Sequence, residues 1–202
     1  MFTGIVAAVG RITRIEPLGK ADAGVRLTIE AGALGLDDVA IGDSIAIQGA
    51  CMTVVERAGN SFAIDISRES LSKTIGLDAP GEVNLEKAVS LSTKLGGHLV
   101  TGHVDGIGEV VKFAPVAESH QLVVRAPKGL AKFIAYKGSV TVNGVSLTVN
   151  SVADVAGGAE FSINLIPHTI AATTLKALAP GAKVNLEIDL IARYVERMLS
   201  AK

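Results

Sequence analysis

The sequence predicts an all-β protein: two homologous Greek-key six-stranded β-barrels followed by a C-terminal α-helix. Two observations carry this prediction, an internal repeat that spans nearly the whole chain and short β-branched runs broken by turn residues in both halves. A third, a helical period of apolar residues, is confined to the tail. Small barrels close their own sheet edges, which favours them over an open sheet for strands this short.

The repeat is the strongest of these signals. Gly49 returns as Gly144 after 95 positions and Val83 returns as Val184 after 101 positions, so the spacing drifts only by small insertions. Solenoid repeats are roughly 20–50 residues long and cannot bury a core alone, whereas each half of this chain is long enough to do so. The recurring segments include Thr3-Gly4 as Thr101-Gly102, Ser44–Val54 as Ser139–Val149, Phe62–Ile64 as Phe161–Ile163, and Val83–Glu86 as Val184–Glu187. We therefore expect a duplicated domain, with one barrel over residues 1–97, a second over residues 98–188 and a helix over residues 189–202.

Each half consists of short expected strands. Turn residues at Ala58-Gly59-Asn60 and Ala156-Gly157-Gly158 predict hairpins, and Gly96-Gly97 predicts a tight crossover between the halves. Brief helical turns are expected over Ser70–Ile75 and Ala171–Leu178, each followed by a Pro-Gly pair. The expected strands include Val25–Ile29, Ser44–Ile47, Met52–Glu56, Phe62–Ile66, Leu122–Arg125, Val140–Val142, Leu147–Ser151 and Phe161–Leu165.

The tail predicts one amphipathic helix of about three turns. Its apolar residues recur at spacings of three and four and are Leu190, Ile191, Tyr194, Val195, Met198 and Leu199. This stripe either docks on its own barrel or packs against other copies of the chain. We favour the second, because several chains can share one seam.

Composition argues against several classes of protein. The chain has a formal net charge of −1 and 3% aromatic residues, so it lacks the basic footprint and stacking aromatics of nucleic-acid binders. No stretch approaches the roughly 18 apolar residues of a membrane helix, and the N-terminus does not resemble a secretory signal. The single cysteine, Cys51, forms no internal disulfide, so we expect a cytoplasmic protein. The four histidines and Cys51 show no zinc-type spacing, and we expect no metal.

Candidate chemistry lies where the two halves differ. At matched positions the first half has Ile5, Ile41, Cys51 and Glu69, where the second has His103, Lys137, Ser146 and His168. Ordinary drift explains any one difference, with Cys51 a small hydrophobe, His103 a satisfied histidine and Lys137 a solvated cation. Together they indicate two pockets of one shape and unlike chemistry, which suits two copies of one ligand with unequal parts in a reaction.

Several segments together resemble a known family. They are Met1–Val6, Gly49–Val54, Gly96–His103, Tyr136–Gly138, Asn143–Val149 and Ile166–Thr169. They are similar to riboflavin synthase of the alpha-chain type, and the similarity runs from Met1 to the C-terminal helix. It implies the last step of riboflavin biosynthesis, in which two 6,7-dimethyl-8-ribityllumazine molecules exchange a four-carbon unit and give riboflavin and 5-amino-6-(D-ribitylamino)uracil.

The resemblance also implies an assembly. It indicates a homotrimer in which each site lies between the N-terminal barrel of one subunit and the C-terminal barrel of the next, with two lumazine molecules per site. No cofactor is required, and lumazine synthase is a candidate partner.

The family's substrate-contacting segments carry over onto both halves. On the first barrel they are Gly4, Ile5, Val6, Cys51, Met52, Thr53, Asp65, Ile66, Ser67, Arg68, Glu69 and Ser70. On the second they are Gly102, His103, Val104, Lys137, Ser146, Leu147, Thr148, Asn164, Leu165, Ile166, Pro167, His168 and Thr169. The expected catalytic residues are Cys51, His103, Ser146 and Thr148.

Roles can be argued from the chemistry of the ligand. A flat heterocycle with a polyol tail suits an apolar slot edged by hydroxyl side chains and backbone groups. His103 is the expected acid and base for the acidic methyl group, because an imidazole titrates near neutral pH. The nucleophile stays open between Cys51, Ser146 and a water oriented by Thr148. Lys137 is expected to stabilise negative charge on the ring.

Some positions depart from the family pattern. His168 stands where a carboxylate is usual, which puts polar binding in the second barrel in doubt. Ala50 stands where some members have cysteine, and Met52 replaces a leucine. A carrier that binds lumazine or flavin without turnover is the alternative function, and the presence of Cys51 and His103 argues against it.

A third alternative is a flavin-reductase-type barrel. That protein would need a nicotinamide-binding domain, for which no part of the chain is left.

Overall fold

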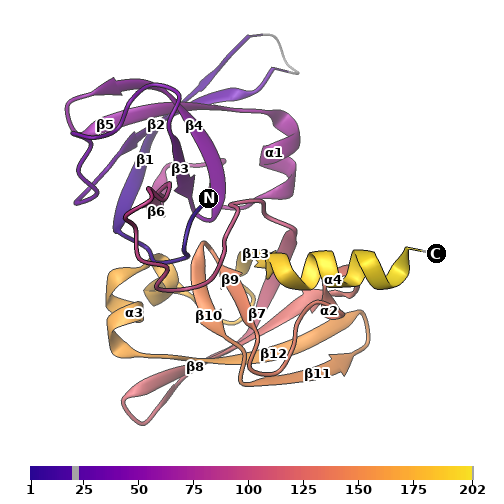
Figure 1. Cartoon of the computed structure of the whole chain (residues 1–202). Coiled ribbons are helices and arrows are strands. Elements are labelled where there is room, and N and C mark those ends of the chain that lie inside the picture. The colour runs from indigo at the N-terminus through magenta and orange to yellow at the C-terminus, as the bar shows by residue number, and fades with distance from the viewer. Residues whose placement is uncertain (20–22, 202) are drawn as a thin grey trace.

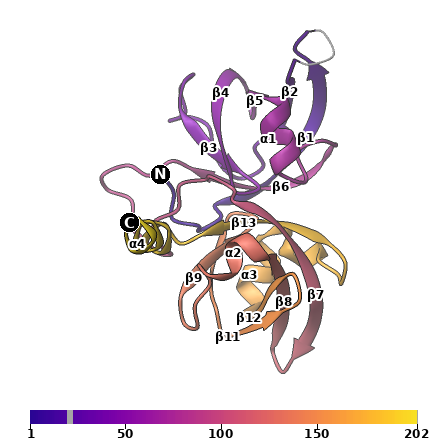
Figure 2. The ribbon, with the colours of Figure 1, turned by 90° about the vertical axis from the view of Figure 1, so that its right-hand side faces the viewer.

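Two lobes of β-strands, one above the other, make up the molecule (Figures 1 and 2). The computed structural model describes residues 1–19 and 23–201. The first half of the chain forms one lobe and the second half the other, each around its own apolar core. Helix α4 (Leu190–Ser200) follows the last strand and lies beside the second lobe (Figure 1).

The first lobe is a closed barrel with the strand order β1-β2-β5-β4-β3-β6. Strand alternation builds its core: Val25, Leu27 and Ile29 of β2 point inward and are buried, and the residues between them are half-buried. All neighbouring pairs are antiparallel. The strands are β1 (Ala8–Pro17), β2 (Val25–Glu30), β3 (Ser44–Ile47), β4 (Ala50–Ala58), β5 (Ser61–Ile66) and β6 (Gly81–Lys87).

The second lobe repeats this order, β10-β9-β13-β7-β8-β12-β11, if β10 and β11 together replace β4. Its strands are β7 (Gly106–Val116), β8 (Ser119–Pro127), β9 (Ser139–Val142), β10 (Val145–Thr148), β11 (Ser151–Val155), β12 (Gly158–Leu165) and β13 (Lys183–Ile188). The prediction of two homologous barrels is confirmed, although the second sheet has seven strands where six were expected. The expected strand Leu147–Ser151 is wrong in its middle. The interruption falls at Asn150, whose amide still donates to Ser162 O at 2.7 Å. The first barrel has a register shift at the matching place, between Val54 and Glu56.

Short helices follow β5 and β12 in the same manner. They are α1 (Arg68–Lys73) and α3 (Pro167–Ala172), the latter followed by the 3₁₀ helix η1 (Thr174–Ala177); α2 (Lys128–Ala131) is a further short helix after β8. Ser67 caps α1 by accepting the Ser70 amide at 3.1 Å, and α3 starts with Pro167, which needs no amide partner there. At the ends of α1 and α3, Thr74 and Thr173 donate their hydroxyls to carbonyls four residues earlier. The expected helical turns are therefore confirmed, with earlier starting points.

The hairpins that precede β4 and β10 hold the two lobes together. Gln48-Gly49 and Asn143-Gly144 both have positive φ angles, as a tight two-residue hairpin requires. They lie against each other so closely that a Cβ on Gly49 would be 2.6 Å from Gly144 N. The side chain of Asn185 donates to Gln48 O at 3.0 Å, and that of Asn84 to Asn143 O at 2.9 Å. The duplicated halves thus exchange equivalent hydrogen bonds across an approximate two-fold relation.

The C-terminal helix is confirmed, and its apolar stripe is uncovered in the single chain. Ile191, Tyr194 and Met198 are 64%, 62% and 70% exposed. Two ion pairs, Arg193 with Asp105 and Lys132 with Glu196, attach the helix to its own second lobe. Among the described residues, no helix is long and apolar enough to cross a bilayer.

Candidate functional site

Two extended segments cross between the lobes, and each contacts the opposite barrel. We call residues 2–6 the first crossing segment and residues 100–104 the second. They pair with each other, because Phe2 and Val100 exchange backbone hydrogen bonds at 2.8 and 3.1 Å. Ser146 N then donates to Gly4 O, and Cys51 N donates to Gly102 O, both at 2.8 Å. Each half of the sequence therefore contributes one segment to the surface around Cys51 or Ser146 in the other half.

The apolar ends of the crossing segments follow the same exchange. Val6 packs against the core of the second barrel, and Val104 packs against the core of the first. The expected assignment of residues 4–6 to the first barrel and residues 102–104 to the second therefore differs from what each segment contacts. A repeat in sequence cannot show this, because it orders segments along the chain and not in space.

Glycine is required where each segment meets its pocket. Gly4 and Gly102 have φ angles of +75° and +76°, which side chains with a Cβ rarely adopt. A Cβ on Gly4 would lie 2.6 Å from Ser146 Cβ, and one on Gly102 would lie 2.7 Å from Cys51 Cβ. The backbone thus approaches the side chains of Ser146 and Cys51 as closely as packing allows.

The first pocket is a cavity of about 260 Å³ between β4, α1 and the second crossing segment. It brings Cys51 and Glu69 together with His103, which was expected on the second barrel beside Ser146. Its full lining is Ala50, Cys51, Met52, Glu69, Ser70, Lys73, Thr74, Gly102, His103 and Val104. Lys73 and Thr74 were not expected there, because nothing in the sequence distinguished them from other residues of a short helical turn.

Ser146 occupies the matching place on the second barrel, and an unexpected histidine contacts it. His98 Nδ1 lies 2.7 Å from Ser146 Oγ, and His98 N donates to Thr3 O at 3.1 Å. Gly97 makes this approach possible, because a Cβ there would lie 2.8 Å from Ser146 Oγ and 2.1 Å from Thr3 O. The recurring segments begin at Thr3-Gly4 and Thr101-Gly102, so His98 lies outside the repeat. Comparison of the halves therefore missed it, although the Gly-Gly-His segment contained it.

Burial favours the neutral form of His98. Removal of the ring from water lowers the pKa of His98, and Asp189 opposes this shift only in part. Its Nε2 is buried and has no hydrogen-bond partner among residues 1–19 and 23–201. The tautomer decides whether Nδ1 donates to Ser146 Oγ or accepts from it. As an acceptor, His98 would draw the proton of the Ser146 hydroxyl.

Lys137 lies apart from the first pocket, on an exposed turn. Its Nζ donates to Asn150 Oδ1 at 3.1 Å. Its amide donates to Val149 O, and in the first barrel Gly42 N donates in the same way to Val54 O. Lys137 is therefore matched by Gly42 and not by Ile41, which corrects the expected pairing.

The other expected residues divide between packing and surface. Met52, Ile66, Leu147 and Leu165 are buried in the two cores, Met52 also edging the first pocket. Three polar residues of the strands, Thr53, Thr148 and Asn164, are exposed. Asp65 points away from the first pocket, since it binds Arg26 at 2.7 Å. The remaining members are Ser67 and Arg68 at the start of α1 and Ile166, Pro167, His168 and Thr169 at the start of α3.

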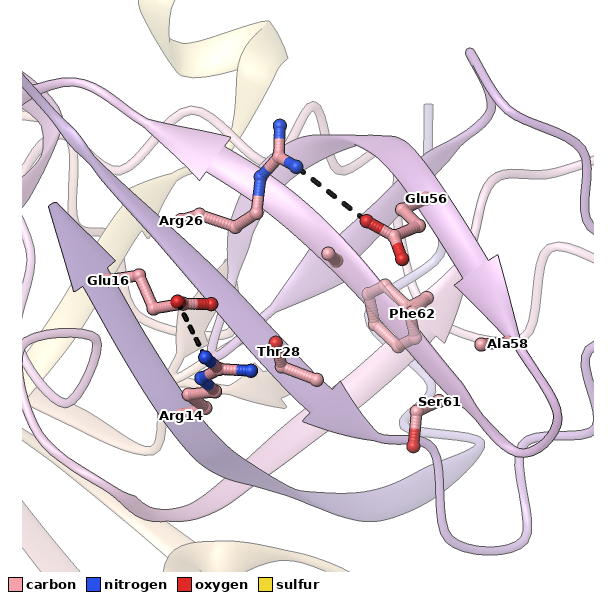
Figure 3. A pocket seen from close by; sticks show the side chains of 9 residues that line it. Arg14, Glu16, Arg26, Thr28, Glu56, Ala58, Ser61 and Phe62 are labelled. Atoms are coloured by element: carbon pink, nitrogen blue, oxygen red, sulfur yellow. Dashed lines mark ion pairs between the residues drawn. The ribbon is translucent and has the colours of Figure 1, made fainter. Parts of the chain in front are cut away.

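A second hollow, of about 160 Å³, lies on the outer wall of the first barrel (Figure 3). Arg14 faces Glu16 at 2.8 Å and Arg26 faces Glu56 at 3.6 Å across it. These charges are paired and solvent-exposed, and neither crossing segment lines the hollow. The pocket around Cys51 is therefore the better candidate for a binding site.

Comparison with known proteins agrees with the duplication. The model of the lumazine binding domain family matches residues 3–88 and again residues 101–189. Riboflavin synthase of Photobacterium phosphoreum is 44% identical over 98% of this chain and 89% of its own length. The Mycobacterium bovis protein of the same name is 43% identical over 98% of both chains, and that of Bacillus subtilis is 38% identical over 98% of this chain and 90% of its own.

Solved structures of LumP resemble most of the chain. LumP complexed with riboflavin superposes with a TM-score of 0.81 at 27% identity, and LumP complexed with 6,7-dimethyl-8-(1'-D-ribityl) lumazine with a TM-score of 0.79. Each match covers 93% of this chain and 99% of LumP.

Proposed function

The chain belongs to the riboflavin synthase family, and from that premise we propose that it converts two molecules of 6,7-dimethyl-8-ribityllumazine into riboflavin and 5-amino-6-(D-ribitylamino)uracil. The enzyme is a transferase, because one lumazine gives a four-carbon unit to the other. The observation that carries the proposal is a pair of matching but chemically unlike places, with Gly102 against Cys51 on the first barrel and Gly4 against Ser146 on the second. A reaction between two copies of one substrate needs two sites of similar shape, and unequal roles need unequal side chains.

The first pocket supports proton transfer. His103 and Cys51 line one cavity with the carboxylate of Glu69. An imidazole in this place can remove a proton from the methyl carbon of one lumazine and later return it. The flat ring would lie against Met52 and Val104, which form the apolar part of the lining.

The place around Ser146 supports nucleophilic addition to the partner ring. Ser146 Oγ has a neutral imidazole at 2.7 Å, which is the arrangement that activates a hydroxyl. Cys51 and a water held by Thr148 are the other candidates for the nucleophile. Binding both rings in reacting register would contribute further, since orientation alone can lower a barrier by about 7–11 kcal/mol in model systems.

We extend the proposal to the assembly and the compartment. The exposed stripe of α4 supports packing against other copies, and a homotrimer would place the N-terminal barrel of one subunit against the C-terminal barrel of the next. In that arrangement Lys137 would reach a pocket from the neighbouring subunit. We place the enzyme in the cytoplasm, with lumazine synthase as a candidate partner. Removal of residues 190–202 should give monomers with little activity, and a truncated chain that still sediments as a trimer would contradict the role of α4.

A carrier function is the second candidate, and the likeness to LumP favours it. One assay separates the two: purified protein receives lumazine alone, and the absorbance of riboflavin is followed. The enzyme produces one riboflavin for every two lumazines consumed. A stoichiometric change of lumazine fluorescence without riboflavin would instead indicate a carrier.

Variants locate the chemistry within that assay. His103→Ala should slow turnover far more than it weakens lumazine binding, because only proton transfer loses its group. Arg14→Ala, in the outer hollow of Figure 3, is the control and should leave turnover unchanged. Cys51→Ser and Ser146→Ala, measured side by side, show which nucleophile the rate depends on. An unchanged rate in His103→Ala would dismiss its acid and base role.

A further inference from the structure

Two buried glutamates hold the crossing segments, and neither was among the expected site residues. Glu86 on β6 is 8% exposed and Glu187 on β13 is 3% exposed. Among residues 1–19 and 23–201, neither forms an ion pair within 4 Å. A buried carboxylate without a cation destabilises a fold unless hydrogen-bond donors satisfy it. Their donors therefore indicate what the carboxylates are for.

The donors are the same in both halves. Glu86 Oε1 accepts from Thr3 N and Thr3 Oγ1, both at 2.7 Å, and its Oε2 accepts from Gly4 N at 3.0 Å. Glu187 accepts three equivalent bonds from Thr101 and Gly102, at 2.7, 2.7 and 3.0 Å. Hydrogen bonds to an ionised acceptor are about twice as strong as neutral ones. Each carboxylate thus fixes the Thr-Gly turn at the centre of one crossing segment.

The far side of each turn lies in the other barrel's pocket. Gly102, held by Glu187 of the second barrel, covers Cys51 of the first and leads into His103. Gly4, held by Glu86 of the first barrel, covers Ser146 of the second and leads into Ile5. We infer that Glu86 and Glu187 are positioning residues for the pocket of the opposite barrel: Glu187 sets the geometry around Cys51 and His103, and Glu86 sets the geometry around Ser146.

A path within one barrel is the competing explanation. Ala46 pairs with both Cys51 and Glu86, so these two lie two strands apart in one row of the first sheet. Ala46 offers only a methyl group, whereas the path across the lobes consists of direct hydrogen bonds. The two explanations predict opposite effects on the two pockets, which makes them separable.

Substitution of glutamate by glutamine tests the inference with little change of volume. Glutamine has one acceptor oxygen and a donor amide, so its NH₂ group would face a backbone N–H that needs an acceptor. Cys51 is the only thiol of the chain, and its rate of alkylation by iodoacetamide reports how well Gly102 covers it. Glu187→Gln should speed alkylation of Cys51 about tenfold, which corresponds to the loss of one buried hydrogen bond. Glu86→Gln is the matched control and should leave that rate unchanged.

The thiol can be moved to the other pocket for the reciprocal experiment. In a Cys51→Ser/Ser146→Cys background, Glu86→Gln should speed alkylation and Glu187→Gln should not. The inference is overturned if each glutamine speeds alkylation in its own barrel, if both rates respond equally, or if neither responds. Circular dichroism checks the fold. If a glutamine variant does not fold, Thr101→Val and Thr3→Val remove one bond each and should give the same crossed pattern, and Thr101→Ser should keep the original rate.

The consequence for catalysis rests on the proposed function. If both pockets take part in one reaction, Glu86→Gln and Glu187→Gln each lower kcat, although neither carboxylate touches substrate. Alkylation does not depend on turnover, so a crossed thiol pattern without any riboflavin formation would leave this inference standing and contradict the proposed function.

Discussion

Addition of one methyl group at Gly102 should lower the free energy of unfolding by more than backbone strain alone would. In Gly102→Ala the new Cβ would lie 2.7 Å from Cys51 Cβ, 2.9 Å from Cys51 N and 3.0 Å from the ring of Phe2. Gly59→Ala is the matched control, because Gly59 also has a positive φ, +57°, but has nothing within 4 Å of its Cβ position. Comparison of the two variants separates the destabilisation by backbone strain from the destabilisation by steric contact.

The expected loss of stability is the sum of the backbone strain and the steric contact. A left-handed alanine costs about 1–2 kcal/mol at either site, and overpacking adds about 1–3 kcal/mol at Gly102 alone. The free energy of unfolding should therefore fall by about 2–5 kcal/mol in Gly102→Ala and by about 1–2 kcal/mol in Gly59→Ala. Displacement of Gly102 should also weaken its bond to Cys51 N, so lumazine turnover falls only in the first variant.

Urea unfolding followed by circular dichroism suits this chain, which has no tryptophan. The same preparations are assayed for riboflavin formation. Equal losses of stability in the two variants would refute the close approach of Gly102 to Cys51. Full turnover in Gly102→Ala would refute its place in the pocket.

Three further predictions concern buried polar groups. Asn185→Ala should lower the free energy of unfolding by at least about 3 kcal/mol, because its side chain bonds three backbone groups of the first half; a loss below 1 kcal/mol in urea unfolding would contradict this. Burial raises the pKa of Glu86 and Glu187 in the folded state. The stability that these two groups contribute is therefore present below their pKa in the unfolded chain, about 4.3, and is lost as the pH rises through their pKa in the folded state. The urea midpoint of the wild type should then fall more steeply between about pH 4 and 7 than that of the double glutamine variant, and parallel curves would contradict the shift. Burial lowers the pKa of His98, so its ring signals in NMR should titrate below the ordinary value of about 6.5, and titration above that value would contradict its desolvation.

The duplicated barrel could be predicted because its signal is local and repeated. Ser44–Ile47 matches β3 from end to end, since β-branched and apolar residues continue up to a glycine turn. Strands β1 and β7 were not expected. Both are long strands that include glycine, proline and charged residues, and they run partly along the outer surface. Their hydrophobic alternation is interrupted where the chain faces water.

The pockets could be predicted only in part. Cys51 and Ser146 stand out because the repeat aligns them, and the structure confirms that they occupy matching places. The alignment of Lys137 was wrong by one residue, because hydrogen-bond register and not residue type decides the match. The crossing of residues 2–6 and 100–104 depends on contacts between distant parts of the chain, which no local pattern encodes.

The stoichiometry of binding tests the central claim most directly. A lumazine analogue that cannot react is titrated into the protein until its fluorescence no longer changes. One binding site on each barrel predicts two molecules bound per chain, and Cys51 protected from alkylation when both are bound. Saturation at one molecule per chain would contradict the account.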